Sequence, residues 1–194
     1  MESEKKNLIA EHALLSEENF LLTAQVEKAF EEVMNRLINA LLKKLDAELQ
    51  HELGSEWAIE NYFDDKAFAL WCFKIYKNKW VHKDDPLYWI GFAPDRRRLG
   101  NFHFYTMRDD DIVKPALPSV NQALNNNYKK GRKGATSDWY QYVDSDYMNW
   151  TDDETLVKLY RQDDMVQYFK EQFIKIKDII EPIVDKEIKK YCSK

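Results

Sequence analysis

The run FALWCFKIY at positions 68–76 determines the class of fold. It is apolar on both faces of an extended chain, which is typical of a strand inside a sheet. Two similar runs follow, LYWIGF at 87–92 and NFHFYTM at 101–107. Because connections of roughly ten residues favour antiparallel pairing of neighbours, these runs predict a β-meander. Residues 57–63 could add an edge strand, so we predict three to four strands.

Two long amphipathic helices flank the meander. Apolar residues recur at steps of three and four between Ser16, a typical helix cap, and Gly54, a typical helix stop. This pattern predicts a helix over residues 17–53. A second stripe runs from Val166 to Tyr191 and predicts a long helix near the C-terminal end.

The order of these elements predicts an α+β fold, an antiparallel β-meander packed against long N- and C-terminal helices. Such helices bury their apolar stripes against one face of a sheet. The 194 residues are enough for one domain with a helical arm. We expect residues 1–15 to form the arm and residues 16–194 to form a single domain.

Composition excludes several classes of protein. Hydrophobic residues make up 44% of the chain, which is enough for a packed core and excludes general disorder. No apolar run approaches the ~18 residues of a membrane-spanning helix, and the first residues do not resemble an export signal. Cys72 and Cys192 are too few and too far apart for a disulfide framework or a zinc finger. We therefore expect a cytoplasmic protein with no membrane partner.

The net charge of −5 is unevenly distributed along the chain. Residues 1–60 carry 6 basic and 13 acidic side chains, residues 61–135 carry 14 and 8, and residues 136–194 carry 9 and 13. The net charges of the three segments are therefore −7, +6 and −4. A basic middle segment keeps nucleic acid among the possible partners of this acidic chain.

Two basic clusters stand out in the middle segment. They are Arg96, Arg97 and Arg98, between the second and third predicted strands, and Lys129, Lys130, Arg132 and Lys133, in a polar loop. Basic loops can neutralise phosphates without reading sequence, and nearby aromatic rings can stack on exposed bases. These seven residues are the candidate nucleic-acid-binding residues. The alternative is that both clusters are solvated loops.

A catalytic alternative depends on one acidic segment. Asp64, Asp65 and Lys66 follow Glu60 closely. Because Mg²⁺ prefers oxygen ligands and a lysine can position water, these four residues could form a minimal metal-dependent nuclease. They also fit a solvated turn in a chain that is 32% charged. Mg²⁺ is expected only under this alternative, and no other cofactor is predicted.

The sequence lacks the short motifs that mark several common classes of enzyme. The sequence contains no glycine-rich phosphate loop, no Gly-x-Ser-x-Gly and no His-Glu-x-x-His. This favours a binding protein over an enzyme.

The aromatic segments after residue 88 resemble a known family. These segments are Trp89-Ile90-Gly91-Phe92, Trp139-Tyr140-Gln141-Tyr142, Tyr147-Met148-Asn149-Trp150 and Asp164-Met165-Val166-Gln167-Tyr168-Phe169. Over residues 57–185 the chain is similar to the C-terminal accessory region of prokaryotic PD-(D/E)XK-superfamily nuclease proteins. The Asp and Glu-x-Lys strands of the nuclease core, which lie upstream in that family, have no counterpart here. The resemblance therefore implies an accessory module of a bacterial or phage defence-type system, not cleavage.

Three functional hypotheses follow. The first is a non-catalytic binding module that contacts nucleic acid or a partner protein through its basic loops. The second is the minimal nuclease. The third is an inhibitor or antitoxin-like protein that docks through helix 17–53, where surplus apolar area would drive formation of a homodimer.

Overall fold

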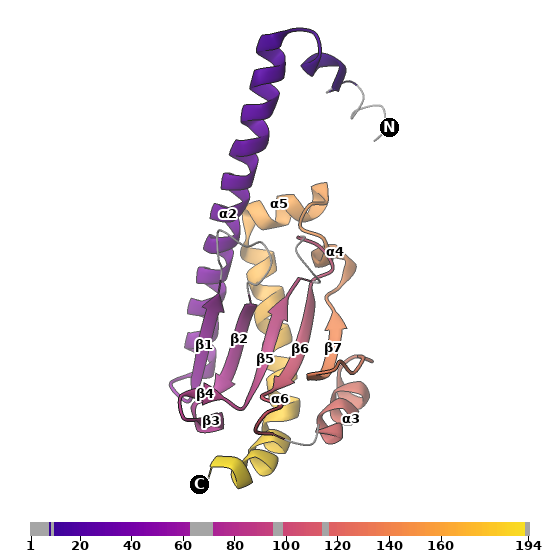
Figure 1. The fold of residues 1–194 in the computed structure, drawn as a ribbon. Coiled ribbons are helices and arrows are strands. Elements are labelled where there is room, and N and C mark those ends of the chain that lie inside the picture. The colour runs from indigo at the N-terminus through magenta and orange to yellow at the C-terminus, as the bar shows by residue number, and fades with distance from the viewer. Residues whose placement is uncertain (1–7, 9, 63–71, 95–98, 114–116, 193–194) are drawn as a thin grey trace. The chain divides into compact units, whose positions relative to one another are not determined.

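The computed structural model describes residues 8, 10–62, 72–94, 99–113 and 117–192. The chain divides into two compact units, residues 1–39 and residues 40–194. The second unit contains the sheet and the C-terminal helix (Figure 1). The predicted arm boundary at residue 15 stays a prediction.

Helix α2 (Glu17–Leu53) has the bounds that the sequence predicts. The Ser16 hydroxyl accepts a hydrogen bond from the backbone N–H of Asn19 at 3.1 Å, which caps the first turn. At the other end Gly54 has a φ of 70°, a conformation that glycine adopts without steric cost. Local signals therefore set both ends of this helix.

The α+β class is confirmed, with long helices near both ends of the chain and an antiparallel sheet between them. Among the described residues, the main sheet has the strand order β1-β2-β5-β6-β7, and every neighbouring pair is antiparallel. Its strands are β1 (Trp57–Tyr62), β2 (Cys72–Lys77), β5 (Tyr88–Ala93), β6 (His103–Arg108) and β7 (Ser137–Tyr142). A 3-10 turn η1 (Asn78–Trp80) and a small hairpin, β3 (Val81–His82) with β4 (Asp85–Pro86), connect β2 to β5.

The fifth strand, β7, goes beyond the three to four strands of the predicted meander. It follows β6 only after helix α3 (Pro118–Asn127), and its register places Tyr140 opposite Tyr105. An irregularity in the pairing at Thr106/Met107 also interrupts its alternation. A strand whose partner is separated from it by a helix leaves no hairpin signal in the sequence.

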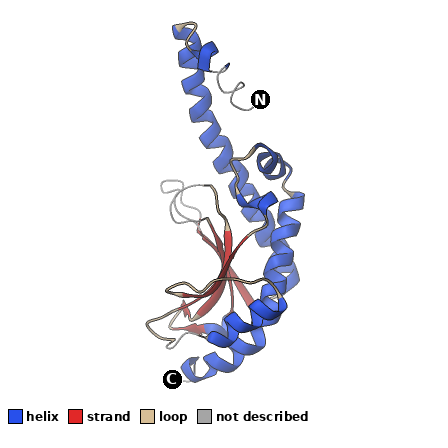
Figure 2. Ribbon diagram, turned by 90° about the vertical axis from the view of Figure 1, so that its right-hand side faces the viewer, coloured by secondary structure: helices blue, strands red, loops and turns tan. Residues whose placement is uncertain are grey.

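After β7, the described part of the second unit contains three further helices: α4 (Ser145–Met148), α5 (Asp153–Arg161) and α6 (Asp163–Cys192). Figure 1 shows α6 running behind the sheet, and Figure 2 shows α6 covering one face of it. Residues 40–53 of α2 lie beside α6. Two ion pairs join the segments, Lys44 with Asp163 at 2.9 Å and Glu48 with Lys170 at 2.8 Å. Within the described residues, none of the helices combines the length and the apolar character needed to cross a bilayer.

Aromatic rings hold α6 against the sheet. The Phe169 ring lies 4.5 Å from the Phe92 ring, and the Phe173 ring lies 5.1 Å from the Phe104 ring. All four side chains are buried. Because aromatic pairs contribute beyond the area that they bury, this cluster stabilises the packing of α6 on β5 and β6.

A buried ion pair ties α3 to the sheet. The Arg108 guanidinium donates to the Asp138 carboxylate at 2.6 Å, and the backbone N–H of Leu117 donates to the same oxygen at 3.1 Å. Asp138 is buried, and Arg108 nearly so. Removing one member of a buried pair leaves the other charge without compensation, so this pair fixes how β6, β7 and the start of α3 meet.

A second polar network joins η1 to α6. The Asp185 carboxylate accepts hydrogen bonds from the Trp80 indole at 2.7 Å and from Lys79 at 2.6 Å. Lys77, which is nearly buried, pairs with Glu181 and lies 3.4 Å from Asp185. Burial by itself raises the pKa of Asp185, but these hydrogen bonds and positive charges outweigh it and hold the pKa below the ordinary value of 3.8.

We expect Phe169→Ala to lower the free energy of unfolding by about 3–5 kcal/mol, because it opens a cavity between α6 and β5. Tyr160→Ala is the control, since that side chain is exposed, and its effect should stay within about 0.5 kcal/mol. Urea unfolding followed by circular dichroism measures both values. Equal losses in the two variants would contradict the proposed role of the ring cluster.

We expect Asp185→Asn to lower the free energy of unfolding by about 1–3 kcal/mol at pH 7. The pKa of Asp185 is lowered in the folded state, so its contribution is complete above the unfolded pKa and is lost as the pH falls through the folded value. The difference between wild type and variant should therefore shrink below pH 3.8. Asp178→Asn, an exposed carboxylate on the same helix, is the control. A difference that does not change with pH would refute this assignment.

Candidate functional site

The face of the sheet opposite α6 is the candidate site. Burial alternates along β6, where Phe104 and Thr106 are buried towards the helices and His103, Tyr105 and Met107 are partly exposed. Figure 2 shows the helices of the second unit on the other side of the strands. Every second residue of a strand, such as His103, Tyr105 and Met107 in β6, therefore lies on a face that no described helix covers.

This face is unusually rich in rings, and we call it the aromatic face. The side chains that define it come from four neighbouring strands and are all partly exposed: Tyr76, Trp89, His103, Tyr105, Tyr140 and Tyr142. The His103 ring lies 5.8 Å from the ring of Tyr105 and 6.0 Å from that of Tyr140. The ring planes of these two pairs are inclined by 46° and 71°, so the rings do not share one plane, and each ring can stack on a flat group only through its own exposed face.

A glycine shapes the centre of the aromatic face. Gly91 on β5 pairs directly with Tyr105 on β6. A Cβ atom at Gly91 would lie 2.2 Å from the Tyr105 Cζ atom, so the ring lies over the glycine. The absence of a side chain at Gly91 therefore allows the Tyr105 ring to lie across β5.

The β1–β2 side of the aromatic face is polar. The Lys74 ammonium pairs with the Glu60 carboxylate at 3.0 Å and lies 5.4 Å from the centre of the Trp89 ring. The Tyr76 hydroxyl donates to Glu60 at 2.5 Å. Glu60, one of the four candidate nuclease residues, is therefore engaged by a lysine and a tyrosine.

The other three nuclease candidates, Asp64, Asp65 and Lys66, lie outside the described residues. Within the described ranges, no group of three or more His, Cys, Asp or Glu side chains could hold a metal ion. The metal-dependent nuclease stays a prediction from the sequence.

The basic loop at 129–134 forms a firm border along β7, and we call it the basic border. Arg132 and Tyr140 exchange two backbone hydrogen bonds of 2.8 Å, and Gly134 donates to the Ser137 carbonyl at 3.1 Å. This segment thus follows the outer edge of β7, next to the aromatic face.

Buried Trp139 anchors the basic border from below. Its indole N–H donates to the Lys129 carbonyl at 3.2 Å, and a Cβ at Gly131 would lie only 2.0 Å from the indole nitrogen. The Asn125 side chain also accepts a hydrogen bond from the Gly131 N–H at 2.8 Å. These contacts hold the backbone of the loop close to β7, so it is an ordered part of the sheet edge.

The charges of the basic border differ in their surroundings. Lys129 pairs with Asp144 at 2.6 Å. Lys130, Arg132 and Lys133 are exposed, and in the part of the chain that the structure describes no carboxylate pairs with them. The other basic cluster, Arg96, Arg97 and Arg98, lies outside the described residues. The described structure therefore places one basic cluster next to the aromatic face.

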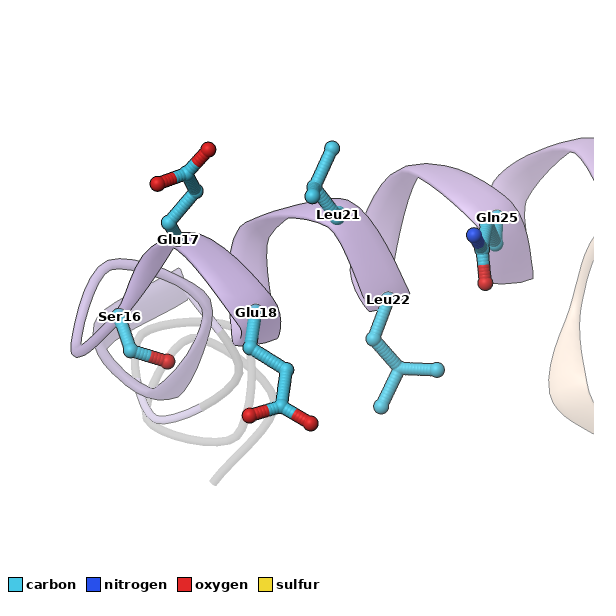
Figure 3. A pocket seen from close by; sticks show the side chains of 6 residues that line it. All are labelled: Ser16, Glu17, Glu18, Leu21, Leu22 and Gln25. Atoms are coloured by element: carbon cyan, nitrogen blue, oxygen red, sulfur yellow. The ribbon is translucent and has the colours of Figure 1, made fainter.

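A hollow in the first unit does not form a comparable site. It is lined by residues of the first turns of α2 and the residue before them: Ser16, Glu17, Glu18, Leu21, Leu22 and Gln25. Figure 3 shows that Glu17 and Leu21 point to one side of the helix and Glu18 and Leu22 to the other. Because the polar groups do not converge, they cannot define a ligand together.

Sequence reasoning identified the basic border but missed the aromatic face. Runs such as 87–92 are apolar at every position, and this pattern indicates burial on both sides of a strand. The available signal was the type of residue. Trp, His and Tyr occupy the partly exposed positions 89, 103 and 105, whereas Ile and Phe occupy the buried positions 90 and 104.

Comparisons with known proteins found no matching family model, no similar curated protein and no similar solved structure. The site is therefore characterised by its own geometry.

We expect Gly91→Ala to lower the free energy of unfolding by about 1–3 kcal/mol, because the new methyl group collides with the Tyr105 ring. In a Tyr105→Ala background the same substitution should cost nothing or stabilise the strand, since alanine loses less entropy than glycine on folding. A double-mutant cycle by chemical denaturation measures this coupling. Coupling within error of zero would show that the ring does not lie over Gly91.

Proposed function

We propose that this chain is a non-catalytic binding module that holds single-stranded nucleic acid on the aromatic face of its sheet. The observation that carries the proposal is the position of the basic border directly beside the rings of β7. A stacking platform combined with a row of cations is the usual composition of a single-strand site.

The aromatic face would supply contacts to bases. Trp89 and Tyr140 are partly exposed and belong to strands separated by β6, so each can offer a ring to a different base. Stacking of a base on an aromatic side chain contributes about 1–3 kcal/mol and tolerates any sequence. Bases inside a duplex are already stacked on each other. The aromatic face therefore favours an unpaired strand.

The basic border would supply contacts to phosphates. Lys130, Arg132 and Lys133 are exposed beside β7, where a strand lying on Tyr140 would pass. Each phosphate that a cation neutralises on a single strand adds about 0.7 to the slope of log K against log salt. Three contacts would therefore produce a slope of about −2.

The wider context is proposed from the sequence. The resemblance to the accessory region of prokaryotic PD-(D/E)XK-superfamily proteins supports a role in a bacterial or phage defence-type system. The two distant cysteines support a cytoplasmic setting. A protein partner on the same basic border is the alternative, and binding measurements with nucleic acid separate the two.

We expect Arg132→Glu/Lys133→Glu to weaken binding of a fluorescent single-stranded oligonucleotide at least tenfold and to reduce the salt slope by about 1.4. Lys43→Glu/Lys186→Glu is the matched control, because it makes the same change in net charge at exposed helix positions. Fluorescence anisotropy measures both affinities. Equal weakening in the two variants would mean that only overall charge matters, and no binding by the wild type would refute the proposal.

The same assay tests the aromatic face. Trp89→Ala and Tyr140→Ala should each weaken binding about five- to a hundredfold without changing the salt slope, since stacking does not displace counterions. Tyr160→Ala, an exposed ring on α5, should have no effect. Thermal unfolding checks that each variant is folded. Tighter binding of a duplex than of a single strand would contradict the stacking role.

A further inference from the structure

The first unit contains an exposed apolar stripe on α2. Its members are spaced by four, four and three residues, which places them on one side of a helix. The exposed fractions are 57% for Leu22, 59% for Val26, 48% for Phe30 and 49% for Val33. Unlike scattered surface leucines, these four side chains form one continuous strip.

The size of this strip points to a binding partner. The four side chains leave apolar area on the order of 400 Å² exposed, which matches the ~300–600 Å² of the largest patch on a typical monomer, and such patches often bind a partner. Two such strips would bury about 800 Å², and flanking polar side chains along the helices raise the total towards the ~1,200 Å² of small stable interfaces. An area at this lower limit suits a weak helix pair.

The charges beside the strip define the orientation of such a pair. Glu18 and Arg36 lie eighteen residues apart, five turns of helix, and so flank the strip on the same side. In an antiparallel pair centred on Val26, Glu18 of each copy lies near Arg36 of the other. Residues 17–39 contain five acidic and two basic side chains. In a parallel pair in register each acidic side chain would lie beside its own copy, so the two helices would repel each other.

We propose that this protein forms a homodimer in which residues 17–39 of α2 pair antiparallel with a second copy, with Val26 at the two-fold axis. Leu22 of one chain then faces Phe30 of the other, and the Glu18–Arg36 attraction occurs twice by symmetry. Arg36 also pairs with Glu32 in its own helix, which orients its guanidinium along the helix. This proposal does not depend on nucleic-acid binding by the second unit.

Light scattering and sedimentation equilibrium test the dimer. The wild type should have twice the 23.2 kDa of one chain, with a dissociation constant of about 1–100 µM. Val26→Ser/Phe30→Ser should raise that constant at least tenfold. Phe20→Ser/Leu21→Ser is the matched control, since it removes equally exposed apolar residues from other sides of α2, and it should change the constant less than threefold. A wild type that stays monomeric at about 100 µM overturns the proposal, whatever else covers the strip.

Cysteine crosslinking tests the register even if a serine variant loses helicity. In a Cys72→Ser/Cys192→Ser background, Val26→Cys should form a disulfide-linked dimer on mild oxidation, and Lys28→Cys, on another side of the helix, should not. Leu22→Cys alone should not crosslink, whereas Leu22→Cys/Phe30→Cys should. Efficient crosslinking of Leu22→Cys alone would show parallel pairing and overturn the antiparallel model.

Charge exchange tests the orientation in solution. Glu18→Arg and Arg36→Glu should each weaken the dimer several-fold, and the two together should restore it, because the pair is then reversed. Weakening in the double variant beyond either single one would contradict the proposed contact.

Discussion

The packing of α6 on one face of the sheet is the contact on which the rest of the second unit depends. Phe169 and Phe173 pack against Phe92 and Phe104, so that every second residue of these strands points into the core. Because neighbouring residues of a strand point to opposite faces, the residues between the buried ones must point away from the helices. The position of Trp89, Tyr105 and Tyr140 on a second face is thus a consequence of where the phenylalanines go.

The aromatic face and the basic border are held by interactions within the fold. Gly91 leaves space for the Tyr105 ring, and Trp139, buried beneath β7, holds the loop that carries Arg132. The Arg108–Asp138 ion pair secures the same end of β7 to β6 and to the start of α3. These contacts fix the backbone of the surface within the fold, and such pre-organisation would reduce the conformational entropy lost in the proposed binding.

The candidate residues differ in how far their chemistry could be recognised in advance. The run of cations from Lys129 to Lys133 made phosphate binding a candidate by residue type, with a solvated loop as the alternative, and the structure adds that the run follows the edge of β7. The aromatic residues were harder to assign to a surface by residue type, since aromatic side chains also fill protein cores. Glu60 became a candidate metal ligand because it precedes Asp64, Asp65 and Lys66, and the structure adds that its carboxylate pairs with Lys74 on the neighbouring strand.

The sequence by itself determined the class of fold and the bounds of α2, because caps, apolar periodicity and turn residues act over a few neighbouring positions. Ser16 begins α2 and Gly54 ends it through a local hydrogen bond and a local backbone conformation. Only the tertiary structure decided that β7 joins β6 after an intervening helix. It also decided which of the two alternating sets of side chains in each strand faces α6. Those choices depend on contacts between residues far apart in the chain, and their free energy appears only when the whole sheet and its helix are assembled.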